Sequence, residues 1–258
     1  MQPLFRSGRY LFAMAILAFG IIQFVNGNFL IALFPLPENF SGRIFLMALI
    51  STLFVGAGIG MMINKIAIRF ALLTAILFLI FMIYPHLFKL FTDLHNGGEW
   101  TVVGEIAALM SGALILAGKI SDRTSDPDRS VQHWYTYGRI IFAISLLIFG
   151  ILHFVYADYI ATLITAWIPF KLFWSYFVGL AFVAAFLGIL TNVKIYLAST
   201  LLGFMFLFWV IFLHLPRLIA KPNVEPEWTS FFIAVAFCGI FFMIAERQQR
   251  GLKPGTPG

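Results

Sequence analysis

Five polar side chains inside apolar stretches of this 258-residue sequence are of types that bind ligands or carry protons: Gln23, His86, Glu105, His153 and His214. Amides, imidazoles and carboxylates form hydrogen bonds, and the last two also exchange protons. All five are expected at a similar depth, so they could line one polar pocket, and we treat them as the candidate ligand site. Their spacing resembles no compact ligand motif, and we expect no metal site.

Glu105 lies five residues after Trp100, an aromatic residue typical of a membrane interface. At 1.5 Å per residue of helix, its carboxylate would be roughly 8 Å further into the membrane. A carboxylate there is costly unless it is paired, protonated or hydrated. Two interpretations stay open. Glu105 accepts a proton or orients a ligand, or its carboxyl reaches the interface or a neighbouring helix.

The three histidines and Gln23 allow the same two kinds of interpretation. His153 and Gln23 occupy matching places in Phe149-Gly150-Ile151-Leu152-His153-Phe154 and Phe19-Gly20-Ile21-Ile22-Gln23-Phe24. Hydrogen bonds between helices would explain both without any chemistry. His86 and His214 also match, at the outer ends of two apolar runs, which favours a structural role.

The elements that must position these residues are membrane-length helices. Apolar residues make up 61% of the chain and charged residues 11%, against about 45–50% and about 25% in soluble domains. The sequence therefore predicts an all-α integral membrane protein with eight transmembrane helices. The expected spans are 9–26, 43–63, 66–85, 101–118, 138–156, 172–191, 194–213 and 229–245.

The chain contains an internal repeat. Gly8-Arg9 and the residues after it return at Gly138-Arg139, and Glu99-Trp100-Thr101 returns as Glu227-Trp228-Thr229. We therefore expect two four-helix membrane units at 1–118 and 138–246. A cytoplasmic linker at 119–137 would join them, and a flexible tail would cover 247–258. With four spans each, the two units would form four-helix bundles that enter the membrane in the same orientation.

The distribution of Lys and Arg predicts the orientation. With both termini in the cytoplasm, twelve of these residues face the inside and five the outside, in agreement with the positive-inside rule. The net charge of +6 is explained by these loops, so we expect no nucleic-acid partner. Although the first apolar run resembles a signal peptide, its recurrence at Gly138 favours a retained span. We expect the inner membrane of a bacterium.

The second unit resembles the DoxX-like family of small membrane proteins. The resemblance rests on Phe149 to Phe154, on Trp167-Ile168-Pro169, on Leu172-Phe173-Trp174 ahead of Gly179, and on the segment from Pro222-Asn223 to Glu227-Trp228-Thr229. The first unit keeps the spacing but has Gln23 in place of the histidine. Membership implies a four-helix bundle for each unit and, from some relatives, an association with quinol oxidases or membrane oxidoreductase complexes. It implies no catalytic residue.

Three functions are compatible with the sequence. The first is an accessory subunit of a membrane redox complex that binds a quinone or lipid-like molecule, and the second is a non-catalytic scaffold for other membrane proteins. The third is a transporter in which Glu105 and His153 carry protons; few polar residues at mid-depth and no clearly broken helix count against it. No haem or flavin motif is visible. Cys238 is the only cysteine, so the chain contains no cysteine pair. The chain is therefore not expected to be catalytic on its own.

Overall fold

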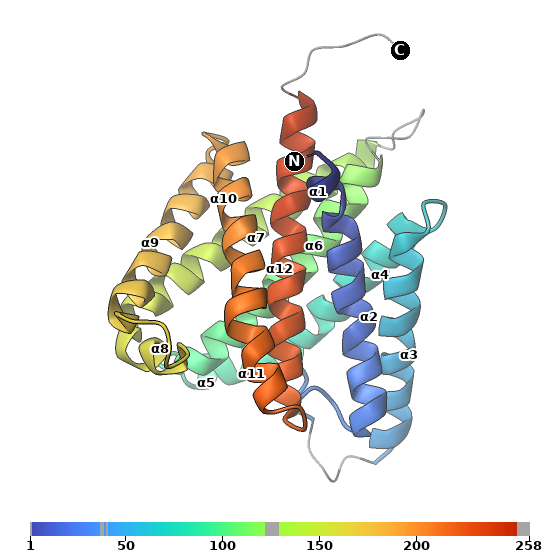
Figure 1. Ribbon diagram of the computed structural model, residues 1–258. Coiled ribbons are helices and arrows are strands. Elements are labelled where there is room, and N and C mark those ends of the chain that lie inside the picture. Colours follow the sequence, from blue (N-terminus) through green and yellow to red (C-terminus); the bar gives the residue numbers. More distant parts are fainter. Residues whose placement is uncertain (1, 37–38, 40, 122–128, 252–258) are drawn as a thin grey trace.

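The computed structural model describes residues 2–36, 39, 41–121 and 129–251, and the described part is helical without strands. Figure 1 shows the helices running side by side as one bundle. In chain order they are α1 (Gln2–Arg6), α2 (Gly8–Asn26), α3 (Arg43–Met62), α4 (Ala67–Phe81), η1 (Met82–Leu87), α5 (Phe88–Thr92), α6 (Gly97–Ser121), α7 (Arg129–Val155), α8 (Ala157–Leu163), α9 (Lys171–Leu190), α10 (Ile195–Trp209), η2 (Val210–His214), α11 (Leu215–Ala220) and α12 (Glu225–Gly251).

Eight of the described helical stretches are long and apolar enough to cross a membrane, as predicted. Their bounds are Pro3–Asn26, Arg43–Met62, Ala67–Thr92, Gly97–Ser121, His133–Val155, Lys171–Leu190, Ile195–Ala220 and Glu225–Gln249. The main differences are at the third and seventh spans, which continue to Thr92 and Ala220. Each of these spans contains a π-helical segment, η1 or η2, and the helix is kinked in η1.

The expectation of unbroken helices is therefore wrong for the third span. In η1, Tyr84 has non-helical φ and ψ angles of −126° and 113° and precedes Pro85, which has no N–H to donate to the helix. In η2 the π-helical turn is followed by Pro216 in the first turn of α11. Both π-helical segments contain a candidate residue, His86 in η1 and His214 in η2.

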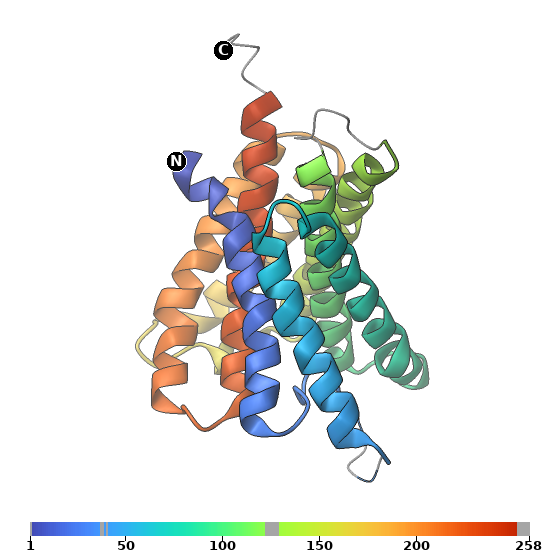
Figure 2. The ribbon, with the colours of Figure 1, turned by 90° about the vertical axis from the view of Figure 1, so that its right-hand side faces the viewer.

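The eight spans form a ring of neighbouring contacts that α6 and α12 also bridge across the middle, so the two halves are not separate four-helix bundles. Around the ring, α2 packs on α3, α3 on α4, α4 on α6, α6 on α7, α7 on α9, α9 on α10, α10 on α12, and α12 on α2. We call α1–α6 the first half and α7–α12 the second half. The last helix of each half thus packs on the first helix of the other, and α6 and α12 also contact each other. Figure 2 shows α2 beside both α3 and α12.

Small residues explain this exchange of partners. A methyl group on Gly8 of α2 would lie 2.7 Å from the carbonyl oxygen of Gly239 in α12, and one on Gly138 of α7 would lie 2.7 Å from that of Ser111 in α6. Backbones can approach this closely only where the contact residues are small. The resulting central helices, α6 and α12, are the most deeply buried spans.

Both α1 and the C-terminal end of α12 lie at the same end of the bundle, which we call the terminal end; α5, α8 and α11 lie at the opposite or distal end (Figure 1). At the terminal end, Lys119 of α6 forms a buried ion pair with Glu246 of α12. The predicted linker at 119–137 is thus helical as far as Ser121 and again from Arg129, and its centre lies outside the described residues. The predicted tail begins late, because α12 continues to Gly251.

Candidate functional site

His86 lies in a fully hydrogen-bonded cluster at the distal end. Its Nδ1 atom is 2.9 Å from Oε2 of Glu99 in the first turn of α6, and its Nε2 atom is 3.0 Å from the backbone oxygen of Leu33. Lys89 approaches the same carboxylate, with its Nζ atom 3.7 Å from Oε1. The imidazole is only 1% exposed. His86 therefore joins η1, α6 and the segment between α2 and α3.

Both partners of His86 are oxygen atoms, one of a carboxyl group and one of the backbone. A neutral imidazole has one N–H donor, so it can satisfy only one of two acceptors. Which ring nitrogen donates depends on the tautomer, and both lie within hydrogen-bond distance of an oxygen atom.

The matching cluster of the second half is built differently. Arg217 binds Glu227 through two contacts, Nε to Oε2 at 3.0 Å and Nη2 to Oε1 at 3.2 Å. His214 is half-buried, and its buried Nδ1 atom has no hydrogen-bond partner among the residues that the structure describes. The carboxylate that pairs with a histidine in the first half thus pairs with an arginine in the second.

Gln23 and His153 make local hydrogen bonds. Ser51 Oγ donates to Oε1 of the fully buried Gln23 across 3.1 Å, which joins α2 to α3. The Gln23 amide nitrogen is buried and has no hydrogen-bond partner in the described part of the chain. His153 donates from Nδ1 to the backbone oxygen of Phe149, one turn earlier in its own helix, across 2.8 Å. Its ring also packs edge-on against Phe182, with ring centres 5.3 Å apart.

Glu105 is half-buried in α6 and makes no hydrogen bond or ion pair with any residue that the structure describes. Its neighbour Gly104 packs directly against Phe149 of α7, because a methyl group there would lie 2.9 Å from that ring. Across the described ranges, no hydrogen bond or ion pair joins any two of the five candidate residues. That they form one polar pocket stays a prediction.

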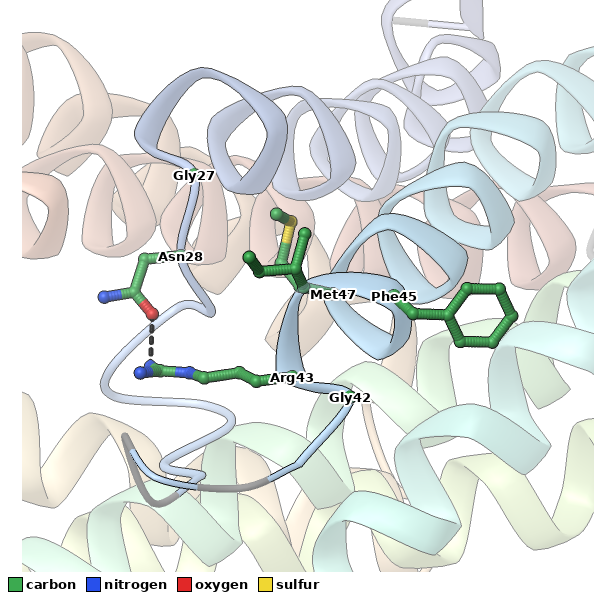
Figure 3. A pocket seen from close by; sticks show the side chains of 7 residues that line it. Gly27, Asn28, Gly42, Arg43, Phe45 and Met47 are labelled. Carbon is green, nitrogen blue, oxygen red and sulfur yellow. Dashed lines mark hydrogen bonds between the residues drawn. The ribbon is translucent and has the colours of Figure 1, made fainter.

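A cavity of about 470 Å³ lies at the distal end between the end of α2 and the start of α3 (Figure 3). Its lining combines a cationic and an amide side chain with apolar ones, from the residues Gly27, Asn28, Gly42, Arg43, Ile44, Phe45 and Met47. Arg43 Nη2 donates to Asn28 Oδ1, and the guanidinium lies 5.8 Å from the centre of the Phe29 ring. We call this cavity the α2–α3 pocket.

The α2–α3 pocket adjoins one of the five candidates. Met47, a lining residue that is 8% exposed, has its sulfur atom 3.6 Å from Ser51 Oγ, and Ser51 bonds to Gln23. Figure 3 shows the Arg43 and Asn28 side chains facing each other, while Phe45 points away from them. The pocket thus has a polar edge at Arg43, and Met47 separates it from the buried amide of Gln23.

The sequence interpretation missed this pocket because it treated Arg43 only as a charge that sets the orientation. The available signal was an arginine at the first position of a span, directly after glycine. Lys171 begins α9 in the same way, after Phe170, and both preceding residues have left-handed φ angles, 84° at Gly42 and 55° at Phe170. That signal does not predict that Asn28, just after α2, contacts Arg43 at the start of α3.

Among the described residues, no group of three or more His, Cys, Asp or Glu side chains lies close enough together to hold a metal ion. Cys238 is buried as a free thiol. No protein-family model, curated protein or solved structure matches the chain. The geometry described above is therefore the basis for a functional proposal.

Proposed function

We propose that this integral membrane protein is an accessory subunit that binds an amphipathic molecule, a quinone or a lipid, in the α2–α3 pocket. One observation carries the proposal: the pocket joins a hydrogen-bonding edge, Arg43 and Asn28, to apolar lining residues such as Ile44 and Met47. Ile44 and Phe45 are 78% and 74% exposed on the bundle surface. A molecule with a polar head and an apolar tail would satisfy both parts at once.

The role as an accessory subunit rests on the chemistry of the side chains. The ionisable side chains at the helix ends form two separate pairs, His86 with Glu99 and Arg217 with Glu227. These pairs stabilise the packing of the helices. A redox reaction would therefore need partner proteins that carry the cofactors. We include in the proposal membership of the DoxX-like family, an origin by duplication, and an inner-membrane location with cytoplasmic termini. These points are supported by the repeated motifs and by the twelve-to-five distribution of Lys and Arg.

The test is to identify molecules that remain bound after purification in mild detergent. We expect about one quinone or lipid molecule per chain, measured by solvent extraction and mass spectrometry. Ile44→Trp should fill the pocket and release it. Leu172→Trp, at the second position of α9, is the matched control and should retain it. Equal retention by both variants, or no bound amphiphile in the wild type, would overturn the proposal.

A scaffold function is the second candidate, favoured by the aromatic surface at the start of α9. Trp167, Phe170 and Phe173 are 63%, 80% and 58% exposed. Such a surface contacts either lipid or another membrane protein. Cross-linking in native membranes from a photoreactive residue at Phe173 distinguishes the two, because reproducible protein adducts support the scaffold and lipid adducts alone oppose it.

A further inference from the structure

We infer that the polar edge of the α2–α3 pocket binds the phosphate group of an anionic phospholipid, an inference that rests on the proposed function and narrows it. The alternative ligand named above, a quinone, has neutral carbonyl groups that accept hydrogen bonds but carry no charge. Three features of the pocket favour phosphate: the N–H donors of Arg43, the start of α3 and the position of the pocket in the span.

Arg43 has donors to spare. A guanidinium carries five N–H groups in a planar fork, and this geometry matches two oxygens of a phosphate. One N–H of Arg43 is committed, to Asn28 Oδ1. Within the described residues, Arg43 forms no ion pair with a carboxylate. Its positive charge is thus not neutralised by the part of the protein that the structure describes, and an anionic ligand would neutralise it.

The backbone beside Arg43 adds donors of the same kind. Because α3 begins at Arg43, the first N–H groups of this 20-residue helix have no acceptor within the helix. The residue before it, Gly42, has no side chain that could cap them. Helix N-termini favour anions for this reason. Here the first three residues of the helix, Arg43, Ile44 and Phe45, all belong to the pocket lining.

The position of the pocket selects a lipid over a free ion. Arg43 is the first residue of a membrane span, the depth at which lipid phosphates lie. Directly after it, Ile44 and Phe45 expose apolar surface, and Val25 at the end of α2 is 79% exposed. A phosphate at Arg43 would therefore place its acyl chains along α2 and α3, where a free phosphate would leave these walls uncovered.

The second half provides the control. Lys171 occupies the first position of α9, as Arg43 does in α3. However, the chain ahead of it forms α8, which packs on α9. A lysine is a point charge without the planar fork. Arg43→Gln and Lys171→Gln remove the same charge from matching places, so a general loss of attraction to anionic lipid would affect both equally.

The experiment measures lipid retention by native mass spectrometry of the delipidated full-length chain in detergent. The probes are phosphatidylglycerol, phosphatidylcholine, ubiquinone and inorganic phosphate, added separately. We expect the wild type and Lys171→Gln to retain phosphatidylglycerol in preference to phosphatidylcholine. Arg43→Gln should retain at least roughly tenfold less phosphatidylglycerol than the wild type. Arg43→Lys should be intermediate. Thermal unfolding of each variant in the same detergent shows whether it is folded.

Each other outcome counts against the inference. Equal loss in both Gln variants would indicate non-specific attraction, and equal retention would exclude Arg43 as the ligand group. If ubiquinone is retained through Arg43 and phosphatidylglycerol is not, the phosphate assignment fails but the proposed function stands. If inorganic phosphate displaces phosphatidylglycerol at low concentration, the site binds free anions instead. If no amphiphile binds, both proposals fail.

Discussion

The two halves of the molecule place the same residue types at the distal end but connect them differently. In the first half His86 bridges Glu99 and Leu33, and Lys89 makes a longer contact of 3.7 Å with Glu99. In the second half Arg217 binds the carboxylate of Glu227, and His214 Nδ1 has no hydrogen-bond partner among the described residues. Some contacts are the same, since Trp100 and Trp228 each donate from Nε1 to a backbone oxygen six residues earlier. A shared sequence pattern thus places a cluster without deciding its hydrogen bonds.

The largest expected difference is between the two histidines. His86→Ala removes the buried ring that contacts the Leu33 oxygen and the Glu99 side chain, and should lower the free energy of unfolding by about 3 kcal/mol. His214→Ala removes no hydrogen bond from Nδ1 and should cost about 1 kcal/mol or less. Chemical denaturation in one detergent would measure both. Similar losses at the two positions would show that the clusters do not differ as described.

The second comparison concerns Gly20 and Gly150, which lie where the first two spans of each half cross. A methyl group on Gly20 would lie 2.6 Å from the Ser51 oxygen and 2.9 Å from the Val55 nitrogen, both backbone atoms. One on Gly150 would meet the movable Val183 side chain at 2.7 Å, with the nearest backbone atom at 3.2 Å. Gly20→Ala should therefore destabilise by about 2 kcal/mol and Gly150→Ala by about 1 kcal/mol or less.

The same denaturation experiment tests this comparison. Gly56→Ala is the control, because nothing lies within 4 Å of its added methyl group. In a helix interior that change should be neutral or slightly stabilising. A larger loss for Gly150→Ala than for Gly20→Ala would contradict the crossing geometry.

The third comparison concerns the basic residues of the two clusters. Arg217 makes two contacts with Glu227 and is 30% exposed, while Lys89 is 45% exposed and 3.7 Å from Glu99. Arg217→Ala should cost about 1 kcal/mol, and Lys89→Ala only a few tenths, because an exposed and poorly oriented pair contributes little. High salt should reduce the difference. If Lys89→Ala costs as much as Arg217→Ala, the lysine holds Glu99 as firmly as the arginine holds Glu227.

The smallest effect is expected at Glu105, whose counterpart in the second half is the buried residue Ile233. Glu105→Ile should leave the unfolding midpoint unchanged or raise it, because it removes a carboxylate without a partner among the described residues. A clear fall in the midpoint would mean that Glu105 forms a stabilising interaction in the membrane. Glu105→Gln in the same assay separates the contribution of the charge from that of the side-chain shape.

The sequence predicted the spans well because membrane crossing depends on local composition. A run of about 20 apolar residues is identified without knowing its neighbours, and the eight predicted spans correspond to the eight observed ones. The π-helical segments η1 and η2 were missed because a π-helical turn adds no change in hydrophobicity. Lys119 was assigned to the linker because a charged residue indicates a polar segment when only local composition is considered. Its buried ion pair with Glu246 depends on a helix far away in the chain.

By itself the sequence determined that the chain is helical and membrane-embedded, and which short motifs recur in its two halves. Those properties follow from the transfer of side chains into lipid and from residue order, which are local. Only the tertiary structure decided that α6 packs on α7 and α12 on α2, that Glu99 pairs with a histidine but Glu227 with an arginine, and that Arg43 borders a pocket. These depend on close approach and hydrogen-bond geometry between segments distant in the chain, to which hydrophobic periodicity is blind.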